Sequence, residues 1–183
     1  MELMIKSVMN ILEQYDIPLL EYFRDLSRLT VTQPGLEEIT FQTAFKSVCA
    51  PLMRNLFSGY LNLNTLMYVW DQYVISSDIP GFHDELIPIM AALVLMSLRD
   101  ELVQTRSVGD FDDCLKTQAN YIQARQMQAL FNKYFFKSMQ QKLNSTPKFG
   151  PIIDPTIGRM QPWEHWHQDI IPFNRRIPQK EKP

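Results

Sequence analysis

Apolar positions in the middle of the chain recur at helical spacing and predict two helices that pack together. In the first, from Asn64 to Val74, we expect one apolar stripe on the side that faces the core. The residues of that stripe are Leu66, Val69, Trp70, Tyr73 and Val74. Asn64 is placed to cap the first turn with its side-chain oxygen. Residues 86–96 are apolar nearly all the way round, so we expect neighbouring helices to bury the second helix.

The same spacing predicts helices on the N-terminal side of this pair. Residues 1–13 carry a helical pattern, and Asp16 is placed to cap a second helix with Pro18 in its first turn, where the missing N–H of proline costs nothing. A further helix is expected over residues 41–60. Pro51 lies inside it and should kink or split it.

On the C-terminal side, Asp110 is expected to cap a short helix that leads into a long helix over residues 118–143. No stretch alternates between apolar and polar residues in the way that a strand requires, so we expect no sheet. The sequence therefore predicts an all-α domain of about six packed helices over residues 1–144.

The character of the chain changes at Ser145. Residues 145–183 hold seven of the twelve prolines, which forbids long helices and favours extended or turn backbone. This tail also carries more large apolar residues than a disordered tail usually does, including Trp163 and Trp166. We therefore expect an extended Pro/Trp-rich C-terminal tail that lies on another surface.

Charge and composition narrow the class of protein. A net charge of −2 over 183 residues gives no electrostatic case for binding nucleic acid or an anionic membrane. The apolar run at residues 86–96 is shorter than the roughly 20 residues that cross a bilayer, and the N-terminus is a poor signal peptide. Only two cysteines occur, as is typical of a reducing compartment. We expect a cytoplasmic protein without membrane insertion and without a cofactor.

The densest chemical cluster is Trp163-Glu164-His165-Trp166-His167 in the tail. Zinc sites usually draw ligands from several spaced positions, and no cysteine is near, so we expect no metal. Tryptophan and arginine are enriched among residues that dominate binding energy. The residues that we expect to bind a partner are Trp163, His165, Trp166, Phe173, Arg175 and Arg176. The alternative, given equal weight, is that both tryptophans fold back over the chain's own domain.

A structural core is expected around the Trp-Asp pair of the first central helix. Burial of a tryptophan ring dominates local packing, so we place Trp70 inside, with Asp71 paired to a basic residue or a backbone N–H. The residues assigned to this core are Phe57, Leu66, Val69, Trp70, Asp71 and Tyr73.

Several segments together resemble the C-terminal half of a TBC domain, the fold of Rab-GTPase-activating proteins. They are Ile11 to Phe23, Phe57 to Leu61, Leu66 to Asp71, Leu86 to Leu98 and Asp110 to Leu115, and their order and spacing agree with that family over residues 1–143. The resemblance implies a helical module that contacts a Rab-type small GTPase.

The resemblance does not extend to the family's catalytic residues. The family's arginine lies in an Ile-x-x-Asp-x-x-Arg motif, which this chain lacks, and its glutamine lies in a Tyr-x-Gln motif. Tyr121-Ile122-Gln123 spells the second motif but follows the Trp-Asp helix where it should precede it. We therefore expect no catalysis by this chain alone, and an apolar face that the missing half would have covered.

Three functions remain open from the sequence. The first is a non-enzymatic scaffold whose tail docks onto a larger assembly, with a cytoskeletal or axonemal (ciliary) setting as an example. The second is part of a Rab GTPase-activating unit whose arginine and glutamine come from a missing segment or a partner chain. The third is a small-GTPase-binding module without catalysis, which needs the helical surface and not the tail.

Overall fold

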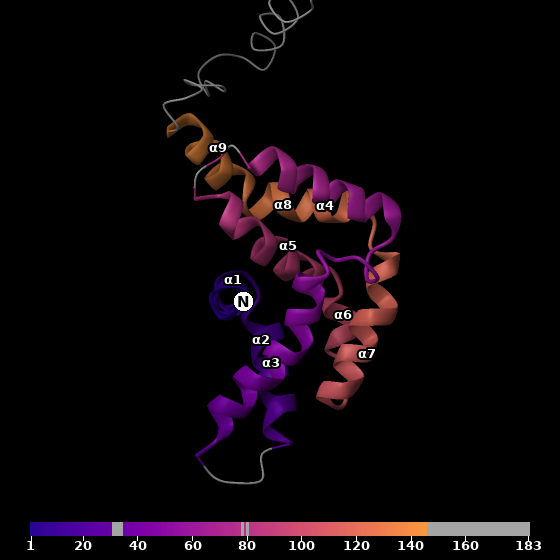
Figure 1. The fold of residues 1–183 in the computed structure, drawn as a ribbon. Helices are drawn as coiled ribbons and strands as arrows, with labels where there is room; N and C mark the ends of the chain where they lie inside the picture. The colour runs from indigo at the N-terminus through magenta and orange to yellow at the C-terminus, as the bar shows by residue number, and fades with distance from the viewer. Residues whose placement is uncertain (31–34, 78, 80, 146–183) are drawn as a thin grey trace, which may run out of the picture. The chain divides into compact units, whose positions relative to one another are not determined.

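The computed structural model describes residues 1–30, 35–77, 79 and 81–145, and this part of the chain is all-α, as predicted (Figure 1). Its helices are α1 (Glu2–Tyr15), α2 (Ile17–Arg28), α3 (Glu37–Arg54), α4 (Leu63–Ser76), α5 (His83–Ser97), α6 (Arg99–Leu102), α7 (Val108–Gln118), the 3-10 turn η1 (Ala119–Tyr121), α8 (Ala124–Tyr134) and α9 (Phe136–Ser145). Residues 1–142 form one compact unit. The predicted extended tail, from residue 146 onward, lies outside the described residues.

Helix α5 is the centre of this unit. Every residue from Leu86 to Leu95 is buried, because α1, α3, α4, α6 and α8 all pack against it. The predicted contact between the two central helices, α4 and α5, is therefore confirmed. Within the described residues, no helix is both long enough and apolar enough to cross a membrane.

The joint between α1 and α2 follows the predicted capping. The backbone N–H of Leu19 donates to Asp16 Oδ1 over 3.3 Å, and Pro18 lies in the first turn of α2. Asp16 is buried, and Arg99 Nε of α6 lies 3.5 Å from the same carboxylate oxygen. One aspartate thus caps a helix and ties two distant segments together.

An aromatic cluster joins α2, α3 and α7. The ring of Phe23 meets the rings of Phe41, Phe45 and Phe111 edge-on, with centroids 6.2, 5.3 and 4.8 Å away. Edge-to-face pairs at such distances are the favoured aromatic geometry, and all four side chains are almost fully buried. This cluster is the core of the half of the unit that lies away from α4.

Two expected helices have different bounds. The helix predicted over residues 41–60 begins at Glu37, runs through Pro51 and ends at Arg54. The single helix predicted over residues 118–143 is wrong, since the chain there leaves helical geometry at Ile122 and again at Phe135. Ser107, and not Asp110, caps α7 by accepting the backbone N–H of Asp110 over 3.0 Å.

Candidate functional site: an exposed apolar face on helix α4

Hydrogen bonds across the fold fix the beginning of α4. Asn62 Oδ1 caps the helix by accepting the backbone N–H of Thr65 over 3.1 Å, so Asn62 takes the role that the sequence suggested for Asn64. Asn62 Nδ2 also donates to the carbonyls of Asn120 and Ile122, over 2.9 and 2.7 Å. The hydroxyl of Thr65 donates to the Ile122 carbonyl over 2.7 Å. These bonds give the Asn120 and Ile122 carbonyls the partners that a continuous helix would otherwise supply. The chain can therefore leave helical geometry between η1 and α8.

Replacing Asn62 with alanine is expected to lower the free energy of unfolding by about 1–3 kcal/mol, because one cap and two side-chain hydrogen bonds are lost. Urea denaturation followed by circular dichroism measures this. Asn64→Ala is the matched control, since Asn64 lies two residues further along the chain and is exposed, and we expect a change within about 0.5 kcal/mol. Equal losses in the two variants would contradict the assignment of the cap to Asn62.

The inner face of α4 packs on α5 and α8, which Figure 1 shows running close to it. Leu66 and Val69 are buried there. Tyr73 is half-buried, and its ring lies 4.4 Å from the imidazole of His83 at the start of α5. These residues hold α4 to the unit and fix which side of the helix points outward.

The outer face carries a second row of large apolar side chains, which we call the α4 stripe. Its members and their exposed fractions are Leu63 (70%), Met67 (46%), Trp70 (38%) and Val74 (68%). Their spacing of four, three and four residues places them in one line along the helix. One further exposed apolar residue of α4, Ile75 (62%), lies beside this row and outside its line. The other exposed large apolar residues of the described chain lie on other elements, such as Leu3 on α1.

The expectation that Trp70 and Asp71 belong to the core is therefore corrected, because both are exposed on the outer side of α4. Phe57, Leu66 and Val69 are buried. The pattern that suggested one stripe combined two: an inner row that includes Leu66 and Val69, and the outer row. A sequence signal for the outer row was present in the spacing of Leu63, Met67, Trp70 and Val74.

The turn before α4 is strained and contacts the stripe. Leu56 and Phe57 have φ angles of 45° and 67°, in the left-handed region that bulky residues avoid. The N–H of Phe57 donates to the Leu52 carbonyl over 3.0 Å, and the fully buried Phe57 ring anchors the turn. The indole N–H of Trp70 donates to the Leu56 carbonyl over 3.0 Å. Leu56, itself partly exposed, is thereby held beside the stripe.

A polar hollow lies at the N-terminal end of the stripe. It has a volume of about 520 Å³, and its lining includes Asn64 of α4, Tyr121 of η1 and Arg125 of α8. None of the side chains that line it is a carboxylate, and Arg125 is exposed. Asp71 is the only charged residue within α4. The stripe is therefore flanked by one positive and one negative group at different heights along the helix.

Ser76 and His83 are the pair that most resembles catalytic machinery, with Ser76 Oγ lying 3.1 Å from His83 Nδ1. A serine nucleophile needs a base that accepts its hydroxyl proton. Here the hydroxyl donates to the Tyr73 carbonyl over 2.8 Å, and Ser76 is buried. Because Ser76 lies on α4 and His83 begins α5, this contact supports the packing of the two helices.

The two cysteines lie in unreactive settings. Burial raises the pKa of the Cys49 thiol far above its usual range, and the charge of Asp112 adds to this effect. Burial also raises the pKa of Cys114, with a smaller effect from Glu101. Since the thiolate is the nucleophile, both groups are poor ones. In the part of the chain that the structure describes, no group of three or more His, Cys, Asp or Glu side chains is arranged to hold a metal ion.

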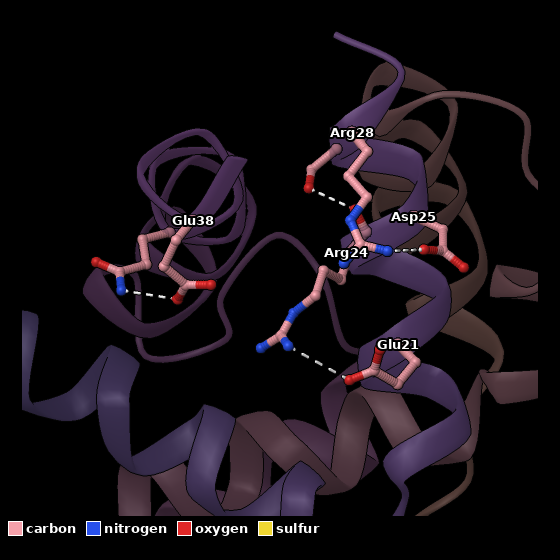
Figure 2. A network of polar contacts seen from close by, with 7 residues as sticks. Glu21, Arg24, Asp25, Arg28 and Glu38 are labelled. Atoms are coloured by element: carbon pink, nitrogen blue, oxygen red, sulfur yellow. Dashed lines mark hydrogen bonds and ion pairs between the residues drawn. The ribbon is translucent and has the colours of Figure 1, made fainter. Parts of the chain in front are cut away.

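Charged side chains form ion pairs along α2 (Figure 2). Arg28 pairs with Asp25 over 2.8 Å, and Arg24 turns away from that pair toward Glu21, at 3.5 Å. The Arg24 guanidinium also lies 4.7 Å from the centre of the Phe41 ring on α3. The ion pairs join residues three apart on one helix, so they add a few tenths of a kcal/mol each.

The residues that the sequence predicted to bind a partner lie outside the described residues. They are Trp163, His165, Trp166, Phe173, Arg175 and Arg176. Their role stays a prediction, and the described part of the chain offers the α4 stripe in their place.

Compared with known proteins, this chain matches no family model, no curated protein and no solved structure.

Proposed function

We propose that this chain is a non-enzymatic protein-interaction module, and that a protein partner covers its α4 stripe. The observation that carries the proposal is the exposure of four large apolar side chains in one line on a single helix. Isolated exposed apolar residues are normal on proteins, whereas a contiguous apolar patch with a polar rim is typical of an interaction surface. Trp70 near the middle of the row belongs to the residue type most enriched among those that dominate binding energy.

The strained turn supports the same proposal. Two consecutive left-handed residues cost about 1–3 kcal/mol each, and such strain persists where it serves a site. In this strained conformation the Leu56 carbonyl accepts the indole N–H of Trp70, and the Leu56 side chain lies beside the stripe. A glycine in place of Leu56 would relax the backbone but remove that side chain.

The class of partner is a further part of the proposal. The resemblance to half of a TBC domain favours a Rab-type small GTPase, bound without catalysis by the helical surface. In the scaffold alternative the tail anchors the chain on a cytoskeletal or axonemal assembly. In the GTPase-activating alternative a partner supplies the missing arginine and glutamine. The exposed α4 stripe favours binding by the helical body, which the small-GTPase-binding function needs.

The test is a photo-reactive cross-linker placed at Val74 in the full chain and activated in cell extract. We expect it to capture a protein, and we expect the same cross-linker at Leu3, which is 82% exposed on α1, to capture none. Capture that survives Trp163→Ala/Trp166→Ala favours the helical body as the binding surface, and capture lost in that variant favours the tail. Equal labelling from Val74 and Leu3 would contradict the proposed function.

A further inference from the structure

The α4 stripe is complementary to itself. Leu63 and Val74 lie equally far from the midpoint between Met67 and Trp70, so the spacing between neighbouring members of the row is the same from either end. When a second α4 runs antiparallel across the first, a two-fold axis at that midpoint sets Leu63 against Val74 of the other copy. Met67 then meets the other copy's Trp70, and a thioether beside an aromatic ring is a favourable contact. Every exposed apolar side chain of the row thereby finds an apolar neighbour.

The flanking charges obey the same symmetry. Asp71 and Asn64 are seven residues apart, so they lie on one edge of the stripe, and Asn64 lines the hollow that holds Arg125. The two-fold axis reverses the direction of the helix but keeps this edge of both copies on the same side of the contact. Asp71 of one copy is then level with position 66 of the other, within one turn of that copy's Asn64. The carboxylate then faces the Arg125 guanidinium of the other copy, and the contact occurs twice.

From these observations we infer that the protein covering the α4 stripe is a second copy of this chain, bound with the two α4 helices antiparallel. The inference rests on the proposed function, since it names the partner of the same face, and on this face the second copy takes the place of the Rab-type GTPase. A two-fold axis that left the helices parallel would exchange the two edges of the stripe. Asp71 and Arg125 would then meet no opposite charge across the contact, so the charges favour the antiparallel arrangement. A single helix pair buries an area at or below the lower end of stable interfaces, about 1,200 Å², so the dimer dissociates in the micromolar range.

Sedimentation velocity on the full chain tests the inference through two charge reversals, Asp71→Arg and Arg125→Asp. Both residues are exposed, so the variants fold as the parent does, which circular dichroism checks. Each variant alone sets like charges against each other twice, and we expect the dimer to dissociate about tenfold more readily. An equimolar mixture of the two variants pairs opposite charges at both contacts. We expect it to associate as strongly as the unchanged chain.

A second pair of variants tests the apolar contact. Val74→Lys buries a charge in both halves of the interface, and we expect dissociation at least about thirtyfold more readily. Leu3→Lys makes the same change at an exposed site on α1 and should leave association unchanged.

Three results would overturn the inference. They are an unchanged chain that stays monomeric up to about 200 µM, single reversals that match the unchanged chain, and a mixture that fails to restore association. The cross-linker at Val74 then separates this failure from that of the proposed function. If the chain is monomeric but Val74 captures a different protein, the second copy is wrong and the proposed function stands. If Val74 captures nothing, both are wrong.

Discussion

Replacing Phe23 with alanine is expected to lower the free energy of unfolding by about 3–5 kcal/mol. The ring is 1% exposed and contacts the rings of Phe41, Phe45 and Phe111, so its loss leaves a cavity where α2, α3 and α7 meet. The three edge-to-face contacts add to the cost of the lost apolar burial. Because domains of this size are stable by about 5–15 kcal/mol in total, this one change removes a large share of the stability.

Urea denaturation measures the loss, with Phe136→Ala as the matched control. Phe136 begins α9 and is 40% exposed, so we expect its truncation to cost less than about 1 kcal/mol. Phe23→Leu, which keeps much of the volume, should fall between the two. A Phe23→Ala variant no less stable than Phe136→Ala would mean that the aromatic cluster does not join the three helices as described.

The sequence predicted the helical class and the buried central helix because both follow from local patterns. Residues 86–96 are apolar on every side, and such a helix is stable only when surrounded, as α5 is. Asp16 before Ile17-Pro18 similarly predicts the start of a helix, and the Asp16 side chain caps α2 there. These features depend on near neighbours in the chain, which is why the sequence alone reveals them.

The break between η1 and α8 could not be predicted in this way. Residues 118–143 have an almost continuous helical pattern, but the carbonyls of Asn120 and Ile122 accept hydrogen bonds from Asn62, some sixty residues away. Those bonds replace partners that the helix would have supplied. A contact between distant segments thus contributes to where the helix ends. A local capping box adds to it, in which Gln126 Oε1 accepts the backbone N–H of Gln123 over 2.8 Å.

The candidate site was missed for a related reason. Periodicity shows that a helix has an apolar face, but it does not show which face a neighbour covers. On α4 the inner and outer rows are both apolar, and only the packing on α5 and α8 assigns Val69 to the core and Trp70 to the surface. The left-handed turn at Leu56 and Phe57 was also hidden, because neither residue type favours that conformation.

Two neighbouring residues of α4 therefore separate folding from binding. Trp70→Ala is expected to weaken association through the α4 stripe at least about thirtyfold, equivalent to about 2 kcal/mol, because a tryptophan near the centre of an interface dominates its energy. The free energy of unfolding should fall by less than this loss in association, since the ring lies on the outer face and the Leu56 carbonyl that it contacts can bond to water instead.

Val69→Ala should behave in the opposite way. Val69 is fully buried on the inner face, so its truncation is expected to lower the free energy of unfolding by about 2 kcal/mol. Association of the folded fraction should be unchanged, because the stripe keeps all four of its members. Urea denaturation measures the first effect in both variants, and sedimentation together with cross-linking yield from Val74 measures the second. If Trp70→Ala proved the more damaging to folding and left association intact, Trp70 would belong to the core after all, and the α4 stripe would be ordinary solvent-facing surface.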